Sequence, residues 1–227
     1  MSTLAMCLKD DMINAILRGE KTQFRKRITE IKHPESEIKD INGQLCGLRQ
    51  KIGWLPILDC CYFKVDDILW IREPWSFPAD EEIAKGVSPT KILYRANGPN
   101  QPIKQKRWKP PVLMPRNFAR VYLYVTNVRL QRLQNITDDE CDKDGVNTEE
   151  YQRHVEQCNI CGIEPMPKRL YWGYYLWDNT LCKRQRHHGY DDIYFDNCWD
   201  TNPLVWVIEF KLCNIVGEPL ETPITIY

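Results

Sequence analysis

The residues best suited to chemistry in this chain of 227 residues lie in a short basic segment, residues 19–27. Four cations fall within seven positions there, beside one hydroxyl and one aromatic ring: Lys21, Thr22, Phe24, Arg25, Lys26 and Arg27. Apolar residues at helical spacing precede the segment between positions 12 and 17, and Gly19 is placed to end that helix. A glycine-terminated helix that leads into a basic turn can hold an anion. The alternative is an ordinary solvated, charged turn.

Glu73 is the second candidate for chemistry, because it follows a predicted buried strand. Residues 68–71 are a continuous apolar run of strand length, and Pro74 stops the ladder just beyond. A carboxylate at the exit of a buried strand can act as an acid or a base. It can equally be a salt-bridge partner, here of Arg72 or Lys21.

Charge is strongly segregated along the chain, although the formal net charge is zero. Residues 83–137 contain eleven cations and no acid, whereas residues 138–164 contain nine acids and only Lys143 and Arg153 as cations. A basic face of this kind can neutralise phosphates, and Lys109, Arg116 and Arg120 are its candidate contacts. The alternative is that the acidic segment folds over the basic one and cancels its charge.

Local patterns predict the elements that must position these residues. Residues 120–126 alternate, which favours a strand with Val121, Leu123 and Val125 facing the core. Thr137 and Glu140 have the spacing of a capping box that opens a short helix. Residues 172–177 are an aromatic cluster better suited to a core than to a ligand site, and residues 204–210 form the last strong strand. This order suits a small mixed β-barrel with helices at its edges.

Cysteines suggest one possible metal site. Cys158 and Cys161 form a C-x-x-C, and Cys182 and His187 follow at distances compatible with a Cys₃His zinc site. With ten cysteines in the chain, free thiols are the leading alternative, and no other cofactor is expected.

Other features limit the function classes. Hydrophobic residues make up 43% of the chain, enough for a core. The start of the chain lacks the pattern of a secretory signal, and no apolar run is long enough to span a membrane, so we expect a soluble, cytoplasmic protein. No G-x-G-x-x-G, Walker loop, G-x-S-x-G or H-E-x-x-H occurs.

The basic segment resembles the G-x-K-x-x-T-x-R signature of the ASCH family. Gly19 and Lys21 match, the threonine position falls on Phe24, and the final arginine position falls on Lys26 with Arg25 beside it. Three further stretches, residues 65–75, 108–116 and 199–210, are similar in this order to ASCH proteins common in phages and prophages. The resemblance reaches from about residue 1 to 212.

The resemblance implies an α+β fold, a PUA-like small mixed β-barrel with flanking helices. It would form a single domain over residues 1–212, with an insertion at about 138–198 and a C-terminal tail at 213–227. The family is associated with RNA binding, and some small members are amidohydrolases that act on acetylated cytidine. Their chemistry uses the lysine and threonine of the motif with a glutamate, which places catalytic candidates here at Lys21 and Glu73. Thr22 is the third candidate, as the nearest substitute for the threonine that Phe24 replaces.

Three function classes therefore compete. The first is a module that binds RNA or a modified nucleoside, with Lys21, Phe24, Arg25, Lys26, Lys109, Arg116 and Arg120 as candidate contacts. The second is an amidohydrolase acting on N4-acetylcytidine or a related nucleoside, against which Phe24 argues because it has no hydroxyl to attack with. The third is a phage-encoded interaction module that docks a host protein. No class requires a membrane.

Overall fold

The computed structural model describes residues 2–28, 37–42, 44–49, 52–99, 101–146, 148–178 and 199–220. Its chain divides into two compact units. Unit 1 comprises Met1–Thr22, Val65–Thr126 and Phe210–Tyr227, and unit 2 comprises Gln23–Lys64 and Asn127–Glu209. Two long strands, β9 (Tyr122–Arg132) and β10 (Leu204–Cys213), contribute residues to both units.

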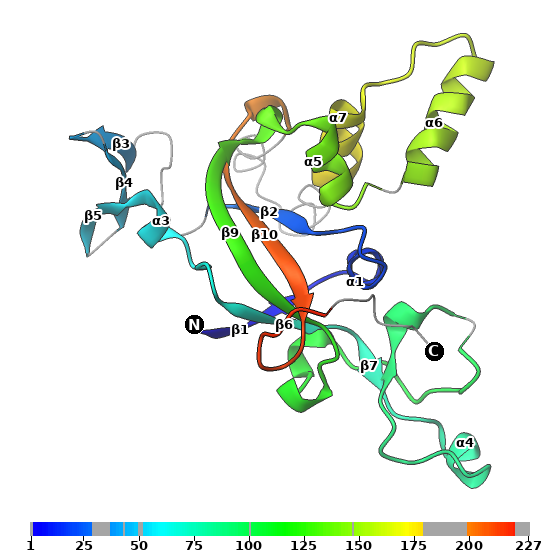
Figure 1. The fold of residues 1–227 in the computed structure, drawn as a ribbon. Helices are drawn as coiled ribbons and strands as arrows, with labels where there is room; N and C mark the ends of the chain where they lie inside the picture. The colour runs from blue at the N-terminus through cyan, green and yellow to red at the C-terminus, as the bar shows by residue number, and fades with distance from the viewer. Residues whose placement is uncertain are drawn as a thin grey trace, which may run out of the picture. The chain divides into compact units, whose positions relative to one another are not determined.

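Unit 1 combines part of a mixed sheet with two α-helices and two short strands (Figure 1). Besides its share of β9 and β10, it contains β1 (Thr3–Cys7), α1 (Asp10–Leu17), β6 (Ile68–Arg72), β7 (Trp75–Ser76), α4 (Asp80–Ala84) and β8 (Leu93–Tyr94). The strand order here is β1-β6-β9, with β1 parallel to β6 and β6 antiparallel to β9. Leu69 lies opposite Leu123 in the β6–β9 register.

The alternation predicted for residues 120–126 is confirmed on its apolar side. Val121, Leu123 and Val125 are fully buried, as the period of two requires. The other face of this strand is also largely covered, because Tyr122 packs with Ile68 in a buried cluster. That tyrosine is therefore a core residue of unit 1.

Helix α1 ends where the sequence indicates. Its buried face is apolar, and Gly19 adopts a φ of +77°, in the left-handed region that favours glycine. The backbone N–H groups of Glu20 and Lys21 both donate to the carbonyl of Ala15, at 2.9 and 3.1 Å. These hydrogen bonds fix the backbone position of Lys21, which follows the helix.

Unit 2 contains β2, a separate small sheet and the helical segment (Figure 1). Its elements, besides its share of β9 and β10, are β2 (Gln23–Arg27), β3 (Ile38–Ile41), β4 (Gln44–Arg49), β5 (Gly53–Pro56), α3 (Ile57–Cys60), α5 (Asp138–Lys143), α6 (Thr148–Ile160), α7 (Lys168–Tyr171) and a π-helix (Trp172–Asp178). The strand order is β9-β10-β2 in one sheet and β3-β4-β5 in the other. β2 runs antiparallel to β10, with Phe24 opposite Ile208.

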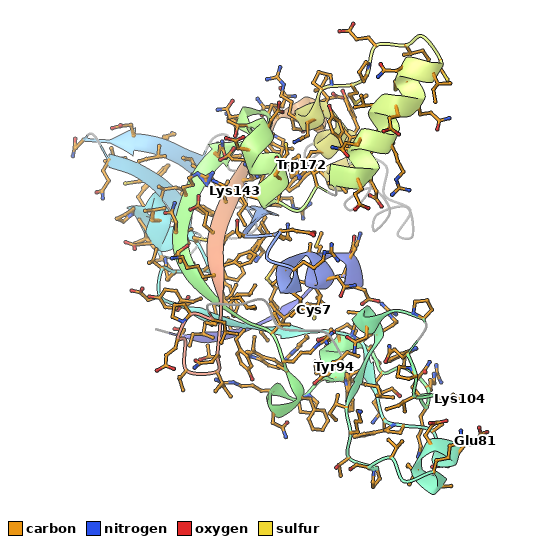
Figure 2. The ribbon with its side chains drawn as sticks, turned by 45° about the vertical axis from the view of Figure 1, so that its right-hand side comes forward. Cys7, Glu81, Tyr94, Lys104, Lys143 and Trp172 are labelled. Atoms are coloured by element: carbon orange, nitrogen blue, oxygen red, sulfur yellow. The ribbon has the colours of Figure 1, made fainter. Side chains whose placement is uncertain are left out.

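Tryptophans build the core of unit 2. Trp172, Trp177 and Trp199 are buried in one cluster with apolar residues of β10 and of the segment after β9. Figure 2 labels Trp172 within the helical part of this unit. The prediction that the aromatic cluster at 172–177 serves the core is confirmed for Trp172 and Trp177, whereas Tyr174 and Tyr175 are exposed.

The predicted mixed α+β class is confirmed, but the closed barrel is not. β1 has β6 as its sheet neighbour and β2 has β10, so each is an edge strand, and no closed barrel forms among the described residues. Sequence periodicity marks buried faces, but it does not determine whether a sheet closes on itself. In the described part of the chain, no helix is long and apolar enough to cross a membrane.

The capping box at α5 is present with both hydrogen bonds, and it generates a stability prediction. The Glu140 N–H donates to the Thr137 hydroxyl at 3.2 Å, and the Thr137 N–H donates to the Glu140 carboxylate at 3.0 Å. Thr137→Ala should lower the free energy of unfolding by about 1 kcal/mol, measured by urea denaturation. Thr137→Ser keeps the hydroxyl and is the control. Equal stability of the alanine and serine variants would contradict the assigned cap.

Candidate functional site

Glu73 lies immediately after β6 and is completely buried in unit 1. Its carboxylate accepts two hydrogen bonds from Arg120, from Nε at 2.8 Å and from Nη2 at 2.9 Å. This is the bidentate arrangement in which a guanidinium matches a carboxylate best. The sequence suggests Arg72 or Lys21 as the partner of Glu73, whereas the structure pairs it with Arg120, 47 residues away.

Arg120 is held on its remaining sides as well. Its Nη1 donates to the side-chain oxygen of Asn97 at 2.7 Å, and its guanidinium carbon lies 4.2 Å from the centre of the Tyr94 ring. The Tyr94 hydroxyl in turn donates to the carbonyl of Phe118 at 2.8 Å. We call Glu73, Tyr94, Asn97 and Arg120 the Glu73–Arg120 cluster; Figure 2 labels Tyr94 within unit 1.

Sequence reasoning misses two members of this cluster, Asn97 and Tyr94. Neither belongs to a motif, and both act through contacts with a residue more than twenty positions away. Tyr94 lies in the short strand β8, and Asn97 lies between that strand and Gly98, a glycine with positive φ. This placement predicts a turn and gives no indication of a partner.

Burial controls the electrostatics of the cluster. Removal from water raises the pKa of the Glu73 carboxyl above its ordinary value, and the hydrogen bonds from Arg120 only partly offset this rise. Burial and the nearby Glu73 charge also raise the pKa of Tyr94 to about 12. The tyrosine is therefore a neutral donor at physiological pH. Both oxygens of the carboxylate are occupied, so this arrangement is suited to holding the strand exit in place.

Lys21 and Thr22, the other catalytic candidates, belong to the same unit as Glu73. Lys21 is buried, and Thr22 is exposed, with its carbonyl accepting a hydrogen bond from the Phe210 N–H at 2.9 Å. That Lys21 and Glu73 face each other in one site stays a prediction.

The remaining residues of the basic segment, Phe24 to Lys26, lie on β2 in unit 2 and pack closely. Phe24 is buried and meets Phe63 edge to face, with ring centres 5.9 Å apart. The ammonium of Lys26 lies 4.6 Å from the centre of the same Phe63 ring. The Phe24 ring is therefore occupied by packing in this structure, and it presents no face for a base to stack on.

Arg25 is buried and forms ion pairs with two acids of the helical segment. Its guanidinium binds Asp144, and it reaches the Glu140 carboxylate at 3.0 Å. Glu140 also pairs with Arg129, and the bonds it accepts lower its pKa against the opposing effect of burial. The guanidinium carbon of Arg25 lies 5.4 Å from the Trp172 ring centre. These contacts engage Arg25 in joining β2 to α5.

The cations of the acid-free stretch differ in their surroundings. Within unit 1, Lys85, Arg95, Lys104, Lys106 and Arg120 each pair with an acid from outside that stretch. Figure 2 labels Lys104 and its partner Glu81 near α4. Lys91, Arg107, Lys109 and Arg116 are exposed and form no ion pair with any described residue.

The predicted zinc ligands fall partly outside the described residues. Cys158 and Cys161 are free thiols, the first half-buried and the second exposed. Cys182 and His187 lie outside the part of the chain that the structure describes. Among the described residues, no three or more His, Cys, Asp or Glu side chains gather where they could hold a metal ion.

Unit 2 also contains an open hollow of about 480 Å³. It is lined by Gln134, Asn135, Ile136, Thr137, Asp138, Pro167 and Arg169. None of the residues predicted from the sequence to bind or to catalyse contributes to it.

Comparisons with known proteins add one similarity. No family model and no curated protein matches the chain. Among solved structures, the chain is similar to the crystal structure of an ASCH domain from Lactobacillus crispatus JV V101, with a TM-score of 0.33 and 12% sequence identity. The match covers 93% of this chain and 79% of that chain. A TM-score this low does not establish a shared fold.

The raised pKa of Glu73 predicts a characteristic pH dependence of stability. Because the folded state binds this proton more tightly than the unfolded state, Glu73 contributes most below the unfolded carboxyl pKa of about 4.3. That contribution disappears as the pH rises through the higher folded value. The free energy of unfolding of the wild type, minus that of Glu73→Gln, should therefore fall as the pH rises above about 4. A difference that rises over this interval would show that Arg120 lowers the pKa.

Proposed function

We propose that the protein binds RNA or a modified nucleotide through exposed cations of unit 1, as an ASCH-type protein. The observation that carries this proposal is the state of Arg107, Lys109 and Arg116. All three are exposed, and none forms an ion pair with a described residue. Cations without an acidic partner are the ones that gain most from meeting phosphates. We call these three residues the basic loop.

Within the basic loop, Lys109 packs against two aromatic residues. The ammonium of Lys109 lies 4.5 Å from the ring centre of Trp75 and 5.2 Å from that of Phe77. The backbone of Lys109 exchanges hydrogen bonds with Trp75 at 2.8 and 3.2 Å. A loop held in this way gives up little conformational freedom when it binds a ligand.

The signature-like segment supports the same class through resemblance, with Gly19 and Lys21 in the positions of the ASCH motif. Its cations are less available for RNA. Lys21 is buried. Arg25 is engaged with Asp144 and Glu140, and Lys26 contacts Phe63. Arg120 likewise is engaged with Glu73. The phosphate contacts are therefore proposed for the basic loop, and not for Lys21, Arg25 or Arg120.

Hydrolysis of acetylcytidine has weaker support than binding. The family nucleophile position is Phe24, which is buried against Phe63. Both carboxylate oxygens of Glu73 accept hydrogen bonds from Arg120, so proton transfer by this group would first require that pair to open. Docking of a host protein is the remaining alternative, and two exposed apolar residues beside the basic loop, Val112 and Leu113, would fit it.

The test is binding of a labelled single-stranded RNA oligonucleotide as a function of salt concentration. Arg107→Glu and Arg116→Glu, made together, should weaken binding and reduce the slope of log affinity against log salt. The expected reduction is about 0.7 for each phosphate that the protein no longer neutralises, or about 1.4 for two. These two residues are chosen because both side chains are exposed, so the substitutions should leave the core of unit 1 intact.

Arg153→Glu is the control, because it makes the same charge reversal at one exposed residue of α6, which already carries Glu149, Glu150 and Glu156. It should leave affinity and slope within error of the wild type. An unchanged slope in the double variant would remove the basic loop from any RNA interface. Salt-insensitive capture of a protein would favour the interaction module.

A further inference from the structure

Helix α6 in unit 2 places a histidine and a cysteine on the same face. His154 and Cys158 are four positions apart, the spacing at which two side chains lie one above the other on a helix. The Sγ atom of Cys158 lies 3.8 Å from Nε2 of His154. Imidazole and thiolate are the two side-chain groups with the highest preference for zinc.

The imidazole of His154 is held in position by three tyrosines. Its ring stacks on Tyr151 at 6.3 Å between ring centres, and it meets Tyr171 at 5.1 Å and Tyr175 at 6.2 Å. Tyr171 and Tyr175 stack on each other at 4.8 Å. A ligand whose ring is fixed by packing before the ion arrives gives up little rotational freedom on coordination.

The separation of the two donor atoms fits a bound ion without rearrangement. Zinc–sulfur bonds are about 2.3 Å and zinc–nitrogen bonds about 2.0–2.1 Å, so donors at the observed spacing would subtend an angle of about 120° at the ion. This is close to the tetrahedral value that zinc prefers. Cys158 is half-buried, so a hydrated ion can approach it from solvent.

We propose that His154 and Cys158 form a two-residue site for a thiophilic divalent ion of the Zn²⁺ type. The ion bonds to Nε2 of His154, whose ring proton is then on Nδ1, and to the Cys158 sulfur. The thiol proton is released to water as the sulfur–metal bond forms. Among the described residues no third protein ligand gathers there, and we assign the other coordination positions to water. The ion is therefore exchangeable, and the site is open to a further ligand.

This site differs from the Cys₃His set that the sequence suggests. It uses His154, which that set omits, and it does not need Cys161, which lies beyond the end of α6 and is exposed. The site belongs to unit 2 and shares no residue with the basic loop. Its presence or absence leaves the proposed RNA binding untouched.

The test is protection of Cys158 from alkylation in the reduced full-length protein. Iodoacetamide labelling of each cysteine is followed by peptide mass spectrometry, with and without added Zn²⁺. At a zinc concentration about ten times the Kd of the site, zinc should slow the labelling of Cys158 about tenfold, because only the metal-free sulfur reacts with iodoacetamide. His154→Phe should abolish this protection, because it keeps an aromatic ring against the tyrosines but removes the nitrogen donor.

Cys161→Ser is the second variant, and it should keep the zinc protection of Cys158. Protection that survives in His154→Phe, or that disappears in Cys161→Ser, would overturn the proposed pair in favour of a set built on C-x-x-C. Cys158 labelling unaffected by zinc at millimolar concentration would overturn the proposal altogether. The far-ultraviolet circular dichroism of each variant checks that α6 remains folded.

Discussion

A carboxylate that is completely buried must be paired, and this constraint organises unit 1. The idealised cost of leaving an ion unpaired in a protein interior is many kcal/mol, and a single bidentate guanidinium can offset most of it. Glu73 receives that guanidinium from Arg120, which is in turn fixed by Asn97 and the Tyr94 ring. The exit of β6, the turn after β8 and the start of β9 are thereby tied to one another. Glu73, whose place in the sequence suits an acid or a base, therefore has a structural role in this cluster.

Unit 2 also contains a buried ion pair, but there the buried residue under discussion is a cation. Arg25 is a buried cation there, and Asp144 and Glu140 of the acidic segment provide its partners. Part of the acidic segment therefore does cancel basic residues, through Arg25 and Arg129. In unit 1 the cations instead pair with acids such as Asp10 and Glu81. Within residues 83–137, Lys91 and the basic loop are exposed and form no ion pair with any described residue, and this motivates the proposal of RNA binding.

The features that the sequence predicts well are local. The end of α1 at Gly19, strand β6 and the capping box of Thr137 each depend on residues a few positions apart, so a short window contains the whole cause. The apolar side of β9 follows in the same way from its period of two.

The features that the sequence could not supply depend on long-range pairing. The sequence predicts that Arg120 contacts phosphate because nothing near it in the chain is acidic, but its partner lies 47 positions away. Phe24 is predicted to contact RNA or a nucleoside, but its ring packs against Phe63. The hydrophobic period of a segment predicts which of its residues face the core, and it does not predict which distant residues pack against them. The open sheet, where a closed barrel is expected, has the same origin.

A double-mutant cycle on Glu73 and Arg120 tests the central claim most directly. Glu73→Gln, Arg120→Met and the double variant would be compared by the free energy of unfolding at neutral pH. Breaking a buried pair from one side typically costs about 3–5 kcal/mol, because the other charge is left uncompensated. We predict that the double variant is more stable than the sum of the single effects implies, by at least about 1.5 kcal/mol. Additivity within about 0.5 kcal/mol would contradict the account, since it would mean that the two side chains do not depend on each other.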